Sequence, residues 1–146
     1  MKLSGKTAIV TGGRQGIGRG IVEAFIDEGA SVTLCGRSSP PKELPEESQY
    51  FQLDVSDPNA VNEFAATVNR VDILVNNAGV QIEKTVTQST DDDWDLVMGT
   101  NARGVFNMCR AILPKMNDGG SIINIGSISG NIADPCLLYT SPSPRD

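Results

Sequence analysis

The segment Thr11–Gly18, TGGRQGIG, constrains the fold of this chain more than any other feature. It ends the apolar run Lys6–Thr11 and leads into Ile17–Glu28, where apolar residues recur at helical spacing. A strand, a glycine-rich turn and a helix in this order can hold the pyrophosphate of a nucleotide. Glycine permits positive φ and lets the backbone approach a phosphate closely. An ordinary strand–turn–helix corner is the alternative, because a glycine triplet alone is a weak signal.

Strand-like and helix-like segments alternate along the rest of the chain. Further strands are expected at Ser31–Cys35, Tyr50–Val55, Val71–Val75 and Ser121–Ile125. Helices are expected after the N-cap Asp57 and, following Thr90, from Asp91 to about Met116. The proline-rich stretch Ser38–Ser48 is expected to be a loop. This alternation favours an α/β protein whose parallel sheet is covered by helices on both faces.

Composition narrows the classes of function. The 146 residues suffice for one domain, and the net charge is −6 without any block of Lys and Arg, so we expect neither nucleic acid nor an anionic membrane as a partner. No segment is long and apolar enough to span a bilayer, and the first residues do not form a signal peptide. Three widely spaced cysteines and no histidine indicate neither a disulfide framework nor a metal site, which points to the reducing cytoplasm.

Five motifs then occur together in a defined order. They are TGGRQGIG, Asp54-Val55, the NNAG turn at Asn76–Gly79, Asn101, and Ser127 after the fifth strand. Together they resemble the short-chain dehydrogenase/reductase family over about residues 4–133. The resemblance implies a Rossmann-type doubly wound parallel sheet, here truncated after the fifth strand. It also implies NAD(P)-dependent hydride transfer between a nicotinamide and a carbonyl or alcohol substrate.

The resemblance also implies which residues contact the cofactor. Asp54 would meet the adenine edge and Val55 would pack near the ring, although a solvated Asp at a strand end is the alternative for Asp54. The NNAG turn would brace the centre of the sheet and lie along the ribose. The expected cofactor-binding set is Gly12, Arg14, Gln15, Gly16, Ile17, Gly18, Arg37, Asp54, Val55, Asn77, Ala78 and Gly79.

The choice between the two nicotinamide cofactors depends on the end of the second strand. An NAD site of this type has an acid about 20 residues after the glycines, and here no acid occurs until Glu43. Arg37 could instead pair with a 2′-phosphate, so the sequence favours NADP(H), with NAD(H) as the alternative. Related NADP(H) enzymes often have a basic residue where this chain has Gln15, which opposes that choice. Whether Arg14 reaches the phosphate in its place is left open.

The catalytic group is incomplete in this sequence. By resemblance, Ser127 would polarise the substrate carbonyl and Asn101 would support a water relay, whereas the family's Tyr-x-x-x-Lys pair is absent. Tyr139 lies near the place of the family's Tyr, but Ser143 stands four residues later and no lysine follows Lys115. A tyrosine without a nearby ammonium keeps a pKa near about 10, so we do not assign Tyr139 a catalytic role.

The last segment of the chain, CLLYTSPSPRD, resembles the translation of a sequencing adapter; a divergent natural C-terminus is the alternative. We therefore expect a partial dinucleotide-binding domain over residues 1–135 and a non-native or disordered tail over residues 136–146. The fifth strand would then have an open edge, which predicts poor solubility.

The sequence as a whole predicts an inactive N-terminal fragment of a short-chain oxidoreductase. A non-catalytic nucleotide-binding module is the alternative, and a relative that uses its cofactor for epimerisation or dehydration is a third. The resemblance further implies a small carbonyl or alcohol substrate and a homo-oligomeric full-length parent.

Overall fold

The structure, a computed structural model, describes residues 1–127. The predicted tail and Tyr139 lie outside the described residues. The strands are β1 (Thr7–Thr11), β2 (Ser31–Gly36), β3 (Ser48–Gln52), β4 (Val71–Asn76) and β5 (Met116–Asn124). The α-helices are α1 (Gly16–Asp27), α2 (Pro58–Thr67), α3 (Asp91–Met98) and α4 (Gly104–Ile112). The shorter helical segments are η1 (Val86–Gln88), the π-helical η2 (Gly99–Arg103) and η3 (Leu113–Lys115).

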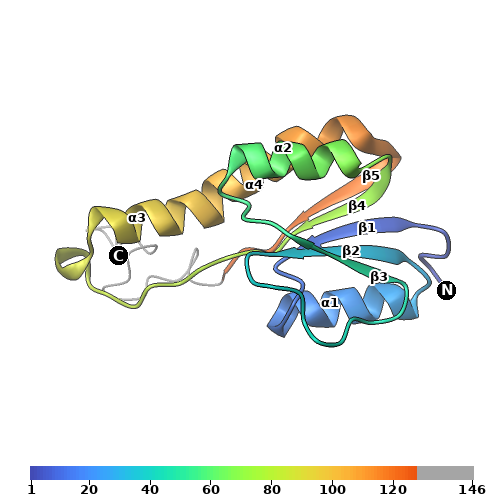
Figure 1. Ribbon diagram of the computed structural model, residues 1–146, viewed down its shortest axis with the longest axis horizontal. Helices are drawn as coiled ribbons and strands as arrows, with labels where there is room; N and C mark the ends of the chain where they lie inside the picture. Colours follow the sequence, from blue (N-terminus) through green and yellow to red (C-terminus); the bar gives the residue numbers. More distant parts are fainter. Residues whose placement is uncertain (128–146) are drawn as a thin grey trace, which may run out of the picture.

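The strands form one parallel sheet in the order β3-β2-β1-β4-β5. Helix α1 lies on one face of this sheet, and α2 and α4 lie on the other (Figure 1). The chain leaves β1 in one direction toward β2 and β3, and later returns to place β4 on the other side of β1. This reversal creates a crevice outside the carboxyl ends of β1 and β4, where open α/β sheets bind ligands. The predicted fold class is confirmed.

The core consists of two hydrophobic layers, one on each face of the sheet. Alternate residues of the strands point to opposite faces, so Val10 packs toward α1 whereas Ile9 packs toward α2 and α4. Phe64 of α2 is 1% exposed and lies with its ring 4.8 Å from that of Phe51, measured between centroids. These two layers hold the carboxyl ends of the strands in a fixed arrangement.

Two of the helices begin at the side-chain caps that the sequence predicts. Asp57 Oδ1 accepts hydrogen bonds from the backbone N–H groups of Asn59 and Ala60 at the start of α2. Thr90 and Asp93 form a reciprocal capping box at the start of α3. Such caps satisfy backbone donors that a helix leaves unpaired in its first turn.

Strand β3 differs from the prediction, which placed it at Tyr50–Val55. It begins earlier, because Ser48 already pairs with Val32 of β2, and it ends at Gln52 opposite Gly36. β2 ends there and offers no further ladder partner. Leu53 and Val55 are buried without belonging to the strand, so their apolar character reflects burial in the core and not strand structure.

The long helix predicted from Asp91 to about Met116 is divided. A π-helical segment, η2, separates α3 from α4, and the α-helical geometry ends at Ile112. Pro114 follows in η3; it lacks a backbone N–H, and its ring would clash with the preceding turn of an α-helix. Met116 already belongs to β5, which starts before the predicted Ser121 because an irregularity in its pairing with β4 takes up the intervening residues.

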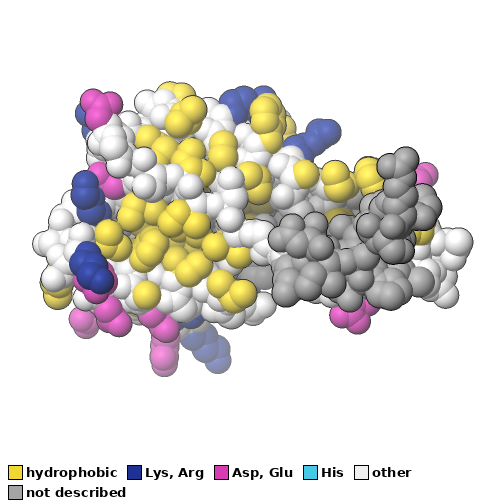
Figure 2. Space-filling view, turned by 180° about the vertical axis from the view of Figure 1, so that it is seen from behind, with side chains coloured by type: hydrophobic (Ala, Val, Ile, Leu, Met, Phe, Trp, Pro, Cys, Tyr) yellow, Lys and Arg dark blue, Asp and Glu magenta, His cyan; other side chains and the backbone are white. Residues whose placement is uncertain are grey.

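Strand β5 pairs with β4, and no strand within residues 1–127 lies on its other side. Its isoleucines Ile122 and Ile123 are 37% and 41% exposed, and Ile125 just beyond the strand is 40% exposed. The side of the molecule facing away from the viewer in Figure 1 carries a broad hydrophobic area (Figure 2). The predicted poor solubility stays a prediction.

Asp72 at the start of β4 joins the amino ends of three strands. Its Oδ2 accepts a hydrogen bond from the backbone N–H of Thr7 at 2.9 Å, and its Oδ1 accepts from Lys6 Nζ and Asn117 Nδ2, both at 3.0 Å. The Thr7 hydrogen bond, then that of Asn117 and the Lys6 ammonium, hold the pKa of Asp72 well below its usual range. The charged carboxylate is therefore the form that the folded state stabilises.

Replacing Asp72 by Asn should lower the free energy of unfolding at neutral pH by about 1–3 kcal/mol, since hydrogen bonds to a charged group are lost. Because the pKa is depressed in the folded state, this contribution is present above the unfolded pKa of about 3.9 and declines as the pH falls below it. Denaturant unfolding between pH 7 and pH 3 should show the difference between wild type and D72N shrinking at acidic pH. The control D118N changes an exposed carboxylate of β5 and should unfold like wild type. A pH-independent difference would contradict the expectation.

Candidate functional site

Helix α1 begins without a side-chain cap, unlike α2 and α3. Its N-cap is Gln15, whose side chain makes no capping hydrogen bond, and Gly16 enters the helix with φ 56°. The first N–H groups of α1 therefore face outward at the mouth of the crevice, with the positive end of the helix dipole. Such an end can bind an anion if the neighbouring backbone leaves room.

Glycines at two positions provide that room. A Cβ on Gly18 would lie 2.3 Å from the Gly12 carbonyl oxygen and 2.4 Å from Asn77 Nδ2, and one on Gly12 would lie 2.9 Å from the same Asn77 atom. Gly12 also has φ 67°, which a residue with a side chain rarely adopts. The sequence predicted both glycines for the turn. The structure adds their reason, which is contact with the NNAG turn.

Thr11 connects the glycine turn to the NNAG turn. Its side chain, 2% exposed, accepts hydrogen bonds from the N–H groups of Asn77 and Ala78, both at 3.0 Å, and donates to the Val75 carbonyl at 3.3 Å. Asn77 Nδ2 donates in return to the carbonyls of Thr11 and Gly12. The carboxyl ends of β1 and β4 are therefore held together by side chains as well as by the sheet.

A hollow of about 380 Å³ opens in front of these turns. The residues lining it are Gly12, Arg14, Gln15, Gly16, Ile17, Gly18, Gly36, Arg37, Ser38, Asn77, Ala78 and Gly79. Ten members of the cofactor-binding set predicted from the sequence are thus brought to one place. Ile17 is 70% exposed there, so its apolar surface is available to a ligand.

Arg14 and Arg37 line this hollow from two different turns. Both are exposed, and neither forms an ion pair with any residue in the range 1–127. Ser38 adds a hydroxyl beside Arg37. No acidic side chain lines the same hollow, so its charge is positive.

A smaller hollow of about 110 Å³ adjoins the first, and both are lined by Gly12, Gly36 and Arg37. Val55 and Thr100 line the smaller hollow only. Thr100 is 4% exposed, and its Oγ1 has no hydrogen-bond partner among the described residues. A buried hydroxyl without a partner is costly, so this atom is suited to meet a ligand. In the sequence, nothing marks Thr100 as a site residue except its position next to Asn101.

Helix α4 holds the Val55 side of the site in place. A Cβ on Gly104 would lie 2.5 Å from Val55 Cγ2, so the helix can approach this closely only with glycine there. The buried Asn107 donates from Nδ2 to the Val55 carbonyl at 3.0 Å. Asp54 lines neither hollow; its Oδ1 accepts from the N–H and hydroxyl of Ser56, and its adenine contact stays a prediction.

The two predicted catalytic residues occupy separate elements. Asn101 lies in the π-helical η2, and its side chain is paired with the backbone of Val80: Oδ1 accepts from the N–H and Nδ2 donates to the carbonyl, each at 2.9 Å. π-helical turns are often found at functional sites. Ser127 is exposed and lies three residues beyond β5. The roles of both stay predictions.

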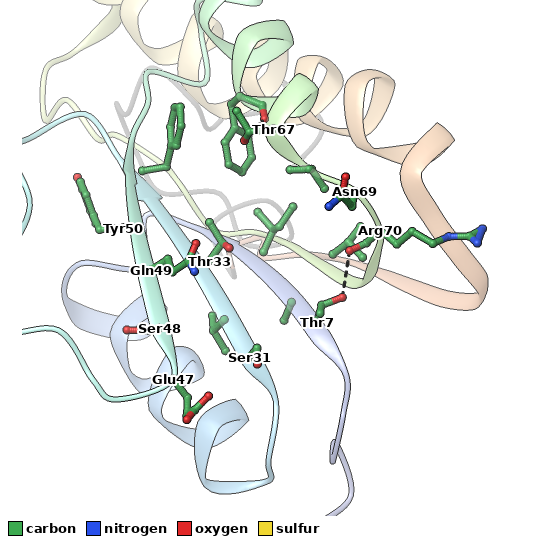
Figure 3. A pocket seen from close by; sticks show the side chains of 17 residues that line it. Thr7, Ser31, Thr33, Glu47, Ser48, Gln49, Tyr50, Thr67, Asn69 and Arg70 are labelled. Atoms are coloured by element: carbon green, nitrogen blue, oxygen red, sulfur yellow. Dashed lines mark hydrogen bonds between the residues drawn. The ribbon is translucent and has the colours of Figure 1, made fainter.

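A third hollow, of about 480 Å³, lies at the opposite end of the sheet. Figure 3 shows Thr7, Ser31, Thr33 and Gln49 around it, with Thr7 Oγ1 donating to the Arg70 carbonyl. It lies at the amino ends of β1 and β2, whereas ligands of open α/β sheets bind at the carboxyl ends. We therefore place the candidate site at the glycine turn.

Comparison with known proteins agrees with this geometry. The family model for short chain dehydrogenases matches residues 6–141. The chain belongs to the short-chain dehydrogenase family. An NADP-dependent (R)-specific alcohol dehydrogenase of Lentilactobacillus kefiri is 36% identical over 150 residues, which cover 93% of this chain and 60% of the relative. A 3-oxoacyl-[acyl-carrier-protein] reductase of Vibrio harveyi is 34% identical over 145 residues, covering 92% and 59%.

Solved structures give the same result. A blue fluorescent protein from a metagenomic library, in complex with NADPH, superposes with a TM-score of 0.87 at 32% sequence identity, covering 96% of this chain and 63% of that protein. This chain spans about 60% of the length of the curated relatives named above. Between residues 1 and 127 no helix has the length and hydropathy that a bilayer crossing needs, and no group of three or more metal-binding side chains occurs.

The glycine contacts predict a sharp difference between two neighbouring substitutions in α1. G18A should weaken nucleotide binding by about tenfold or more and lower stability by about 1–3 kcal/mol, because its methyl group would meet backbone. G20A adds the same methyl group where nothing lies within 4 Å, and alanine favours helix, so binding should persist and stability should be equal or higher. Fluorescence titration and thermal unfolding of both variants test this. Equal behaviour of the pair would contradict the close-approach argument.

Proposed function

We propose that this chain binds NADP(H) in the crevice beyond β1, β2 and β4, and that it derives from an oxidoreductase of small carbonyl or alcohol compounds. The proposal rests on its family and on one observation. Arg14 and Arg37 converge, without acidic partners, on the hollow that also contains the uncapped start of α1. A nucleotide that carries a diphosphate and a separate 2′-phosphate matches those two features.

Each part of the site has a part of the cofactor to hold. The amides of Gly16, Ile17 and Gly18 would receive the diphosphate, as helix N-termini do. Val55 and the unpartnered Thr100 hydroxyl would line the adenine pocket, with Asp54 at its edge. Gly79 and its neighbours Asn77 and Ala78 would lie along a ribose. Bound NADPH supplies a hydride at C4 of its nicotinamide.

Arg37 should decide which nicotinamide cofactor binds. R37A should weaken NADPH binding by about 10- to 100-fold, since a charge-assisted hydrogen bond is worth about 1.5–3 kcal/mol, and should leave NADH affinity within about twofold. R14A should also weaken NADPH binding selectively. That result would show that Arg14 reaches the 2′-phosphate although position 15 is Gln15 and not a basic residue. The control R70A removes an arginine at the opposite end of the sheet and should change neither affinity. Parallel loss of NADH and NADPH binding in R37A would contradict a 2′-phosphate contact.

The chemical step needs groups beyond the cofactor site. In the proposed reaction the Ser127 hydroxyl would polarise the substrate carbonyl, and Asn101, fixed on Val80, would support a water relay. A proton must reach the carbonyl oxygen as the hydride arrives. The printed sequence contains no Tyr-x-x-x-Lys pair to supply it. We therefore infer that this 146-residue chain binds the cofactor but does not catalyse hydride transfer to a carbonyl substrate.

A simple assay separates binding from turnover. The 146-residue chain should quench or shift NADPH fluorescence on titration, yet should not oxidise NADPH when ketones and aldehydes are added. Absorbance at the nicotinamide band measures this, with buffer and G18A protein as controls. Carbonyl-dependent oxidation at an ordinary enzymatic rate, about 1 per second or faster, would contradict the proposed need for the Tyr–Lys pair.

We also propose that the full-length parent is a homo-oligomer of the cytoplasm that does not bind nucleic acid. Large apolar side chains lie exposed along α3 and α4, including Trp94 at 51% and Phe106 at 58%, with Arg110 stacked over the Phe106 ring. Exposed apolar surface of this kind commonly marks a protein interface. Cys35 and Cys109 are free thiols, which suits a reducing compartment.

A further inference from the structure

The turn that follows β2 is held by side chains of the neighbouring edge strand β3. Tyr50 Oη approaches the Gly36 carbonyl oxygen at 2.9 Å and the Ser38 carbonyl oxygen at 2.5 Å. Gln52 Nε2 donates to the Arg37 carbonyl at 2.9 Å. Three consecutive carbonyls, one on each side of Arg37 and that of Arg37 itself, therefore accept hydrogen bonds from β3 side chains.

The backbone adds one more constraint on the same turn. The N–H of Leu53 donates to the Gly36 carbonyl at 2.8 Å, so this oxygen accepts two hydrogen bonds. A Cβ on Gly36 would lie 2.9 Å from Tyr50 Oη. The absence of a side chain at Gly36 thus makes room for the tyrosine hydroxyl, in addition to any room that it leaves for a ligand. Tyr50 can place its hydroxyl here only because residue 36 is glycine, and the Gly36 carbonyl in turn accepts a hydrogen bond from that hydroxyl.

Tyr50 is a suitable donor for this purpose. It packs with the hydrophobic layer on the α1 side of the sheet, and Figure 3 shows it on the opposite side of β3 from Gln49 and Thr33. Burial raises its pKa, which the charge of Arg14 partly offsets, so the phenol keeps its proton at neutral pH. That one proton is shared between two carbonyl oxygens. The Arg14 charge that acts on this phenol belongs to the same hollow as Arg37.

A long side chain keeps its direction only if its backbone is fixed. Arg37 is exposed, and its guanidinium makes no ion pair within residues 1–127, so only its main chain directs it toward the hollow. The residues after it, up to the start of β3, contain three prolines and no regular element. The turn would therefore move with this loop if β3 did not hold it.

We propose that Tyr50 and Gln52 are positioning residues for cofactor selectivity: by holding the carbonyls of residues 36–38, they direct Arg37 and Ser38 to the 2′-phosphate of the bound nucleotide. This inference rests on the proposed NADP(H) site. It extends the selectivity determinant from the turn after β2 to the edge strand of the sheet. The effect is specific, because NADH lacks the group that Arg37 and Ser38 would meet.

The test measures dissociation constants of NADPH and NADH for the full chain and two variants. Y50F removes only the hydroxyl, and Q52L removes only the donor to the Arg37 carbonyl. Each should weaken NADPH binding by about 3- to 10-fold, as expected for one lost hydrogen bond, and leave NADH binding within about twofold. Q49L is the matched control for Q52L, since Gln49 lies on the same strand and points to the other face. It should change neither constant.

A double-mutant cycle identifies the route of the effect. If Tyr50 acts through Arg37, then Y50F should lower NADPH affinity less in the R37A background than in wild type, because only Ser38 is left to be positioned there. Thermal unfolding of every variant shows whether the protein remains folded. Q52L keeps the test valid if Y50F unfolds, since Gln52 is an exposed residue.

Two sets of results would overturn the inference. In the first, Y50F and Q52L weaken the binding of NADPH and NADH equally, or weaken the binding of neither while R37A still lowers NADPH affinity selectively. β3 then does not set selectivity, whereas the proposed NADP(H) site remains supported. If wild type shows no preference for NADPH, or R37A does not reduce it, the proposed function fails and the inference fails with it. Selective loss of NADPH affinity in both variants, with a smaller loss from Y50F in the R37A background than in wild type, supports the inference.

Discussion

The buried hydroxyl of Thr11 is the contact on which the crevice depends. It lies at the carboxyl end of β1 and accepts two backbone N–H groups of the NNAG turn after β4. Asn77 completes the connection by donating to the Thr11 and Gly12 carbonyls. β1 and β4 diverge in their connections at this point, and these contacts join the two halves of the sheet at its carboxyl edge, as those of Asp72 do at its amino edge. The glycine turn and the NNAG turn are one structural unit.

The rest of the site is assembled around this unit from segments distant in sequence. Gly104 and Asn107 of α4 fix the backbone at Val55, which forms the wall of the smaller hollow. The strand β3 fixes the turn at Arg37 through Tyr50. Both supports come from residues that line neither the phosphate turn nor its hollow. Packing and hydrogen bonds outside the hollow thus determine the positions of Val55 and Arg37, which line the site.

Much of the fold could be predicted because its signals are local. Apolar runs followed by the glycine turn and by the NNAG turn mark β1 and β4, and Asp57 and Thr90 mark helix starts. The predicted cofactor-binding residues followed from the family resemblance that the motifs carry, and ten of the twelve line one hollow. Val55 lines the adjoining hollow.

What could not be predicted depends on partners distant in sequence. The ends of β3 are set by where β2 stops, and the long helix is interrupted by a π segment that no residue pattern announced. The need for glycine at Gly36 is set by Tyr50, 14 residues later, whose hydroxyl a Cβ there would approach to 2.9 Å. Thr100 is identified as a candidate site residue by its burial and by the missing hydrogen-bond partner of its hydroxyl within residues 1–127, which the sequence does not show.

The hydrogen bonds from β3 also separate the turn at Arg37 from the loop that follows. The residues from Ser39 to Glu46 lie between two anchored points, since Ser38 is held by Tyr50 and the Glu47 carbonyl accepts the Val32 N–H. Insertions or deletions in that interval would change the length of a surface loop without altering the contacts at either end. Proteins with this fold can therefore differ in the sequence and length of this loop while the Arg37 side chain keeps its direction.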